Sequence, residues 1–277
     1  MKLGLRLQSK SIATYTVVSC HFGDLFWITH LADSLQKFGD DRINDFVIVD
    51  QSREKQPELS VIPGVTKVLA FDPDEDQIAI GGHDHPASLD RVLRYWQFRS
   101  SHVIIFDSDA FPISPRWLAD LPDVILAEAP GTSGELSHPC FMVFPVEAIQ
   151  RVSFSEGFLD RHDKETRLRF DTGRMVARQL RESGYEVVMS PAIAGYQGLR
   201  GHMYAQGTVY HHGHASHTAA PQHLQVFTST KTEELWKRKI ARGEWTLLPR
   251  DYFRLGYHYL ARRISSKLRK MIRRAGS

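Results

Sequence analysis

The chain has 277 residues, and its 42% hydrophobic and 24% charged residues are typical of a soluble globular protein with one large α/β domain and an appendage. Its formal net charge is +3. Seven basic residues and no acidic one lie between Arg262 and Arg274, so the rest of the chain carries 3 − 7 = −4. The sequence therefore gives no support to a nucleic-acid-binding surface across the main domain.

The two cysteines, Cys20 and Cys140, each lie in an apolar, strand-like run. Because no disulfide framework and no Cys-x-x-Cys pair is visible, we expect buried thiols in a reducing compartment and no zinc ribbon. The apolar run within the first six residues is broken too early for a signal peptide. No stretch has the apolar length that spans a bilayer. These features predict a cytoplasmic protein.

The first third of the chain predicts a βαβ unit. A strand at 15–20 precedes a turn in which Asp24 can cap a helix that ends at Gly39. Buried strands follow at 46–49 and 65–71. This spacing implies parallel strands joined by a right-handed crossover.

A polar loop at 72–86 contains Gly81-Gly82-His83-Asp84-His85 and opens a helix with Leu89, Val92, Leu93 and Trp96 on its inner face. A glycine-rich loop at a helix N-terminus favours phosphate oxygens. No Gly-Lys-Ser/Thr follows, so the loop is not of the Walker type. An ordinary flexible loop explains the composition equally well.

The most apolar segment, 103–106, leads directly into Asp107 and Asp109. It reads as a strand buried on both faces that Pro112 prevents from continuing, and its carboxyl end is where open α/β folds bind ligands. Aspartate is rarely buried without a partner, so we expect a cation or a donor-rich ligand there. The alternative is that the two aspartates cap a turn or the next helix.

The second half predicts strands at 124–127, 140–144 and 186–189, and helices at 146–151, around 175–180 and around 232–241. A loop before the last of these helices is dense in histidine: His202, His211, His212, His214 and His217. From Phe253 to Arg274, apolar residues at steps of three and four predict an amphipathic helix with a basic face. That helix either lies in an anionic membrane interface or docks on the body.

The order of these features resembles the GT-A fold glycosyltransferases, in particular the family 2 group of nucleotide-diphospho-sugar transferases. The resemblance covers roughly residues 14–216, with Asp-x-Asp, Phe170-Asp171 and the segment Val-Tyr-His-His-Gly-His-Ala-Ser as its specific points. It implies an α/β fold with a Rossmann-like mixed sheet flanked by helices. We expect a GT-A domain at 12–220 and a C-terminal helical extension at 221–277.

The resemblance also implies an enzyme that moves a sugar from a nucleotide-sugar, with a UDP-sugar favoured, to a glycan or lipid-linked acceptor hydroxyl. Such transfer, inverting by this resemblance, belongs to bacterial-type polysaccharide or glycoconjugate synthesis. Mn²⁺ or Mg²⁺ would offset the charge that builds on the departing nucleoside diphosphate. Lipid-linked acceptors favour a peripheral position at the inner face of the membrane.

By the same resemblance Asp109 would bind the metal directly, while Asp107 would contact the ribose or reach the metal through water. His211 would approach the metal or the diphosphate. The other expected nucleotide-binding residues are Ser19, Asp24, Asp50 at the base edge, and His85.

Asp171 falls where the family keeps its catalytic base, which takes the proton of the acceptor hydroxyl. The family usually has Glu-Asp here, whereas this chain has Phe170-Asp171. Asp171 can also act as an N-cap of the following helix, and the two roles are compatible.

The acceptor or sugar side is expected around Glu128, His138, His212 and His214. On a strand, His211 and His212 would point in opposite directions, so at most one of this pair faces the site. A histidine cluster without function is the alternative.

Three other functions compete with this one. A phosphatase of the haloacid-dehalogenase type also ends a strand in Asp-x-Asp, but this chain has Phe111 where such enzymes carry Thr or Val. A sugar-phosphate nucleotidyltransferase would need a glycine-rich basic loop after the first strand. A GT-A-like domain could also bind a nucleotide or carbohydrate without turnover.

Overall fold

The computed structural model describes residues 12–52, 54–72, 84–119, 121–129, 134–156, 172–194, 201–213 and 230–244. Its centre is a seven-stranded sheet of order β3-β2-β1-β4-β7-β6-β8. The strands are β1 (Tyr15–His21), β2 (Ile43–Asp50), β3 (Lys67–Leu69), β4 (His102–Asp107), β6 (Ile125–Glu128), β7 (Ser137–Pro145) and β8 (Val188–Ser190). Only β7 among them runs antiparallel to its neighbours, which confirms the predicted mixed, Rossmann-like α/β sheet.

A second, antiparallel sheet has the order β5-β11-β10-β9. Its strands are β5 (Ala110–Pro112), β11 (Val209–His211), β10 (His202–Tyr204) and β9 (Ile193–Ala194). The expectation that Pro112 ends the strand was wrong in part, because the chain resumes as β5 in the other sheet. Proline is tolerated there because β5 is an edge strand. The prediction that His202 and His211 lie in a loop was also wrong, since both lie in strands.

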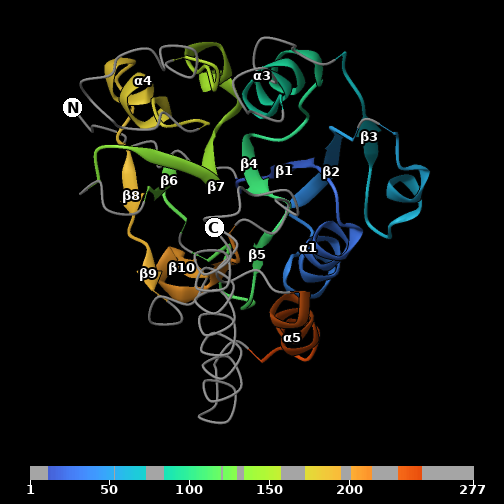
Figure 1. The fold of residues 1–277 in the computed structure, drawn as a ribbon. Helices are drawn as coiled ribbons and strands as arrows, with labels where there is room; N and C mark the ends of the chain where they lie inside the picture. The colour runs from blue at the N-terminus through green and yellow to red at the C-terminus, as the bar shows by residue number, and fades with distance from the viewer. Residues whose placement is uncertain are drawn as a thin grey trace, which may run out of the picture.

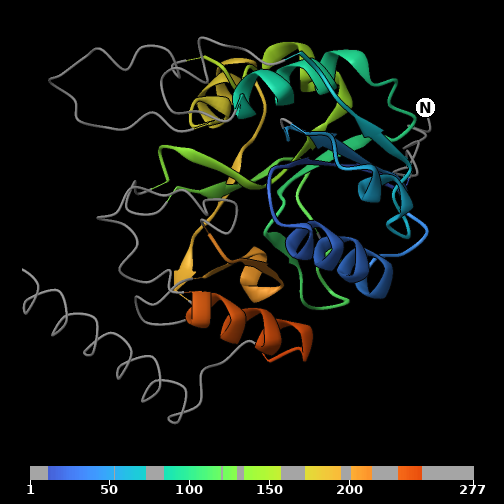
Figure 2. The same ribbon diagram turned by 45° about the vertical axis from the view of Figure 1, so that its right-hand side comes forward.

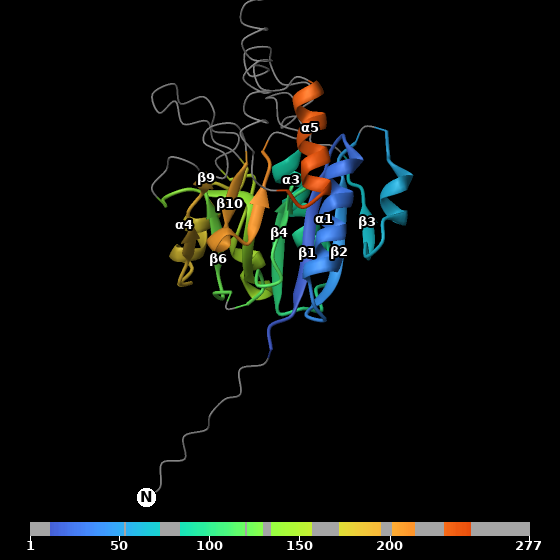
Figure 3. The ribbon, with the colours of Figure 1, turned by 90° about the horizontal axis from the view of Figure 1, so that it is seen from below.

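Helices cover both faces of the central sheet (Figure 1). On one face lies α1 (Leu25–Phe38), with α5 (Thr230–Ala241) alongside it, and on the other lie α3 (His85–Tyr95) and α4 (Val176–Glu182) (Figure 2). The view from below shows α5 running beside α1 (Figure 3). Within the described residues there are also three short 3₁₀ helices: η1 (Pro57–Val61), η2 (Val146–Arg151) and η3 (Ala205–Gly207).

Helix α1 begins and ends where the sequence predicts. The side chain of Asp24 accepts a hydrogen bond from the Phe26 main-chain nitrogen at 2.9 Å, and Gly39 is the C-cap. One face of the helix, including Trp27, Ile28 and Leu31, is fully buried in the hydrophobic cluster that also contains the β5 and β11 side chains. Burial of this stripe therefore joins the small sheet to the central one.

On the opposite face, Asp90 of α3 ties a distant loop to the helix. Its buried carboxylate accepts hydrogen bonds from the main-chain nitrogens of Phe154 (2.7 Å) and Ser155 (3.1 Å) and from Ser153 Oγ (3.0 Å). These donors have no strand or helix of their own to satisfy them. The carboxylate therefore fixes the chain after η2 against α3.

The strand order creates a ligand-binding edge. The chain moves outward from β1 to β2 and β3, and then returns to place β4 on the other side of β1. Loops that follow β1 and β4 therefore diverge, and open α/β sheets bind ligands in the crevice at such a switch point. Asp107 is the last residue of β4, directly at this edge.

Several predictions fall outside the part of the chain that the structure describes. These are the catalytic base Asp171, the acceptor-side His214, most of the Gly81 to His85 loop and the basic amphipathic helix at 253–274. Helix α5 lies within the predicted extension, and its Ile240 is buried in the same cluster as α1. No helix in the described residues is both long enough and apolar enough to cross a membrane.

Candidate metal centre at the carboxyl edge of the sheet

Two aspartates lie between the two sheets. Asp107 is the last residue of β4, and Asp109 is the second residue of the turn at 108–109 that leads into β5. Asp109 is buried, with 5% of its surface exposed, whereas the Asp107 side chain is 17% exposed. The buried strand β4 thus delivers one carboxylate to the interior and one to the rim of the edge.

His211 reaches this pair because β11 aligns with β5. In the register of these strands His211 faces Ala110, and the next main-chain nitrogen, of His212, donates to the Asp109 carbonyl at 3.0 Å. The His211 Nε2 atom lies 3.3 Å from Asp109 Oδ1 and 3.6 Å from Asp107 Oδ2. The strand pairing therefore places an imidazole against both carboxylates.

Two more histidines surround Asp107. His85, the first residue of α3, has Nε2 3.8 Å from Asp107 Oδ1, and His138 of β7 has Nδ1 3.9 Å from Asp107 Oδ2. The rings of His138 and His211 lie 5.2 Å apart between centroids. Three histidines from three elements thus face one carboxylate at the switch point.

The electrostatics of His211 reflect this setting. Burial by itself lowers the pKa of the imidazole, but Cys140 and the Asp109 carboxylate outweigh burial and raise that pKa well above its ordinary value. Positive charge is therefore favourable between the two aspartates, whether it comes from an imidazolium or from a cation.

The donor set fits a divalent cation. Asp107, Asp109 and His211 each offer a ligand atom, and these atoms all lie within 4.8 Å of one another. Carboxylate oxygens are the ligands that Mg²⁺ and Mn²⁺ prefer, and an imidazole extends the set toward transition metals. The three residues predicted to bind metal are thus close enough together to hold one ion.

His212 does not join this cluster. Its ring stacks on Trp27 of α1 at 4.4 Å between centroids, and the Tyr210 hydroxyl lies 3.1 Å from its Nδ1 atom. His212 therefore faces the apolar side of α1 while His211 faces the carboxylates, as the alternation of a strand requires.

Two of the residues predicted to bind nucleotide have structural contacts that involve no ligand, and a third lies inside the central sheet. Both carboxylate oxygens of Asp50 accept main-chain hydrogen bonds of the next loop, from Ser52 (2.9 Å) and Gln56 (3.0 Å). Asp24 caps α1 and is paired with Lys237 of α5. Ser19 is fully buried in the middle of β1. Their nucleotide contacts stay predictions.

Glu128, predicted on the acceptor side, closes a loop. Its Oε1 atom accepts a hydrogen bond from the Gly134 main-chain nitrogen at 2.8 Å. Gly134 has a φ of +78°, a conformation that glycine adopts readily. Of the other two predicted acceptor-side residues that the structure describes, His138 lies at the metal centre and His212 does not.

The sequence did not predict that Cys140 lies at the metal centre. The apolar run around this residue predicts only a buried thiol. In the structure both cysteines are buried and free. However, Cys140 also groups with His138 and His211, with one ligand atom from each lying within 4.8 Å of the others. The spacing His138-x-Cys140 was the available signal, since residues two apart on a strand can share a face.

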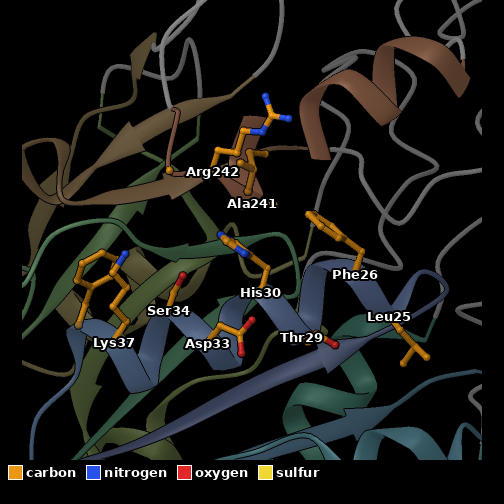
Figure 4. Close-up of a pocket in the computed structure, with 12 residues that line it drawn as sticks. Leu25, Phe26, Thr29, His30, Asp33, Ser34, Lys37, Ala241 and Arg242 are labelled. Carbon is orange, nitrogen blue, oxygen red and sulfur yellow. The ribbon is translucent and has the colours of Figure 1, made fainter. Parts of the chain in front are cut away.

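A separate cavity of about 680 Å³ lies between α1 and the end of α5. Figure 4 shows His30, Asp33 and Ser34 along α1 below Ala241 and Arg242. None of the residues that line it belongs to the predicted site. The cavity is therefore distinct from the metal centre.

No family model matches the sequence, and no curated protein matches it. Among solved structures, the chain is similar to mannosyltransferase PcManGT from Pyrobaculum calidifontis in complex with GDP-Man and Mn²⁺, at 15% identity over 66% of this chain and a TM-score of 0.47. The chain spans only 56% of that mannosyltransferase.

The chain is also similar to glucosyl-3-phosphoglycerate synthase from Mycobacterium tuberculosis, at 12% identity and a TM-score of 0.42 over 65% of this chain and 70% of that one. A third similar structure is Staphylococcus aureus TarS 1-349, at 17% identity and a TM-score of 0.39 over 52% of this chain and 51% of that one. All three likenesses have an identity of 17% or less and a TM-score below 0.5.

Proposed function

We propose that this protein is a metal-dependent glycosyltransferase that moves a sugar from a nucleotide-sugar to an acceptor hydroxyl. The observation that supports it most is the convergence of Asp107, Asp109 and His211 at the carboxyl edge of the sheet, beside the switch point between β1 and β4. A UDP-sugar is the favoured donor, and a glycan or lipid-linked molecule in bacterial-type polysaccharide synthesis is the favoured acceptor.

The proposed roles follow from burial. Asp109 and His211 are buried and would hold Mn²⁺ or Mg²⁺ from the protein side, and the more exposed Asp107 would face the ribose or the diphosphate. The bound cation would offset the charge that develops on the departing nucleoside diphosphate. His85 and His138 flank Asp107, and as imidazolium ions they could donate to phosphate oxygens.

Asp171 remains the proposed base that takes the proton of the acceptor hydroxyl in an inverting transfer. The described chain that follows it is tied to β7 by hydrogen bonds. Ser137 Oγ donates to the Gly173 carbonyl at 2.7 Å and accepts from the Ala177 nitrogen at 3.2 Å. A base needs such a fixed backbone to meet its substrate at hydrogen-bond distance.

We also propose that the protein works in the cytoplasm, at the inner face of the membrane. The support is the alternation of apolar and basic residues at 253–274, since each basic residue near an anionic surface contributes about 1 kcal/mol. Truncation after Tyr259 should abolish sedimentation with anionic liposomes and leave nucleotide-sugar hydrolysis intact. Unchanged sedimentation would contradict the membrane role alone.

The function is tested by a thermal-shift panel of nucleoside diphosphates and nucleotide-sugars, with and without Mn²⁺. A ligand at a hundred times its Kd stabilises the folded state by about 2.7 kcal/mol, which raises the Tm measurably. Because the proposed site holds the nucleotide through the cation, we expect a fitting nucleotide to raise the Tm only when Mn²⁺ is present. Stabilisation by no nucleotide, or equal stabilisation without metal, would contradict the proposal.

Two rival functions are separated by further assays. Asp171→Asn should keep nucleotide binding and lose sugar transfer, whereas in a non-catalytic binding domain no transfer exists to be lost. A phosphatase would release inorganic phosphate from phosphomonoesters. Phe111, which departs from the phosphatase pattern, is fully buried in the apolar cluster beneath α1.

A further inference from the structure

A thiol lies next to the proposed cation position. Cys140 is fully buried, and its sulfur belongs with His138 and His211 to a group whose ligand atoms all lie within 4.8 Å of one another. In the pairing of β7 with β6 the register shifts between Met142 and His138, and Cys140 lies in this irregular part of the strand. Such irregularities re-aim side chains, here toward the metal centre.

The imidazole of His211 has two ring nitrogens in different surroundings. Its Nε2 atom faces the aspartates, whereas its buried Nδ1 atom has no hydrogen-bond partner within the described residues. Cys140 lies close enough to this ring to act on its pKa. A buried polar atom without a partner is unfavourable, so a ligand at this side of the ring would be stabilised.

We propose that Cys140, His138 and His211 form a second cation position beside the carboxylate one, and that it selects thiophilic ions such as Zn²⁺. Sulfur and imidazole ligands suit Zn²⁺, whereas carboxylates suit Mg²⁺ and Mn²⁺. On binding, the S–H bond of Cys140 breaks and His211 coordinates as the neutral imidazole, so the thiol proton and the extra ring proton of His211 leave to solvent, and the sulfur pair bonds to the metal without any change of oxidation state. Coordination through His138 Nδ1 replaces the 3.1 Å hydrogen bond that this atom accepts from the Cys140 nitrogen.

The two positions exclude each other. A neutral imidazole has a single lone pair on its ring nitrogens, so His211 can serve one cation at a time. An ion bound at the sulfur side therefore withdraws His211 from Asp109. Zn²⁺ at this position inhibits whatever reaction needs a cation between Asp107 and Asp109, and this holds even if that reaction is not sugar transfer.

Burial raises the pKa of the Cys140 thiol. A bound Zn²⁺ deprotonates a coordinating thiol outright, and this overcomes the effect of burial. Among the described ligands of this position, the His138 side chain is 21% exposed whereas Cys140 and His211 are buried. His138 is therefore the most accessible of the three proposed ligands.

The test is titration of the reduced, tag-free chain with Co²⁺, a spectroscopic substitute for Zn²⁺. A thiolate-to-cobalt charge-transfer band should appear in the wild type and in Cys20→Ser, the matched control at the other buried cysteine, and be absent in Cys140→Ser. Absence of the band in the wild type, or its persistence in Cys140→Ser, would overturn the proposal. Histidines alone cannot produce this band, so adventitious binding is distinguished.

A second variant decides the matter if Cys140→Ser does not fold. His138→Ala removes a partly exposed side chain, and it should weaken Zn²⁺ binding at least about tenfold. Mn²⁺ bound to the wild type, followed by electron paramagnetic resonance, should be displaced by Zn²⁺, and His138→Ala should need at least about tenfold more Zn²⁺. Equal Zn²⁺ requirements in the two proteins would overturn the proposal.

Discussion

His211 Nε2 lies 3.3 Å from Asp109 Oδ1, although the two residues lie far apart in the sequence. Pairing of β11 with β5 produces this approach, and the His212 nitrogen locks it by donating to the Asp109 carbonyl at 3.0 Å. The contact joins the edge of the central sheet to the second sheet. The metal centre therefore depends on the small sheet as much as on the Asp-x-Asp strand.

Replacement of this histidine should weaken the metal centre. His211→Ala removes one of three ligands, so we expect Mn²⁺ affinity to fall by at least about tenfold, measured by calorimetry on the folded variant. An affinity within twofold of the wild type would show that the imidazole is not a ligand.

His212 provides the matched control on the same strand. His212→Ala removes the stacking on Trp27 and the contact with the Tyr210 hydroxyl, so we expect a loss of about 2 kcal/mol in the free energy of unfolding. Mn²⁺ affinity should stay unchanged. A fall in affinity as large as that of His211→Ala would assign His212 to the site and contradict the geometry.

Replacement of Gly173 by alanine should lower the stability of the protein by more than its positive φ alone would. A Cβ at this position would lie 2.9 Å from the Phe154 ring, with φ at +68°, so both strain and overlap oppose Gly173→Ala. Gly184→Ala is the control, because φ is +88° there and nothing lies within 4 Å of the added atom.

The control should lose about 1–2 kcal/mol from backbone strain alone. Gly173→Ala should lose about 1–3 kcal/mol more from overlap, as measured by urea denaturation. Equal losses would mean that Phe154 moves away freely. The segment after Asp171 would then be less rigid than the proposed role of that residue requires.

Asp90 should matter for stability because it satisfies three donors of residues 153–155. Asp90→Ala leaves the buried Phe154 nitrogen and the two part-buried serine donors without their acceptor, so we expect a loss of about 3 kcal/mol in urea denaturation. Asp123→Ala, whose side chain is 73% exposed beside His102, should change stability by less than about 1 kcal/mol. A similar effect of both changes would show that the loop finds other partners.

Much of the fold could be predicted from local pattern. Helix α1 follows from Asp24, the apolar stripe and Gly39, and β4 follows from an unbroken apolar run. These signals are local because caps and periodicity act within a few residues. Gly184 likewise follows α4 with a φ of +88°, as predicted for a residue after a helix end.

The second sheet could not be predicted in this way. Its strands β5, β10 and β11 have three residues each, too short for a period of two to stand out, and Pro112 indicated an end rather than an edge strand. Asp107 and Asp109 were identified from sequence. The approach of His211, His138 and Cys140 to them depends on the pairing of β11 with β5 and of β7 with β4, which local pattern does not show.

The central claim is that Asp107, Asp109 and His211 bind the divalent cation through which a nucleotide is held. Its most direct measurement is calorimetric titration of Mn²⁺, followed by UDP, into the wild type and Asp109→Asn, which keeps the size of the side chain and removes its charge. We expect the wild type to bind Mn²⁺ and to bind UDP only when Mn²⁺ is present. Asp109→Asn should stay folded and lose both. Mn²⁺-dependent UDP binding of equal affinity in the two proteins would contradict the assignment.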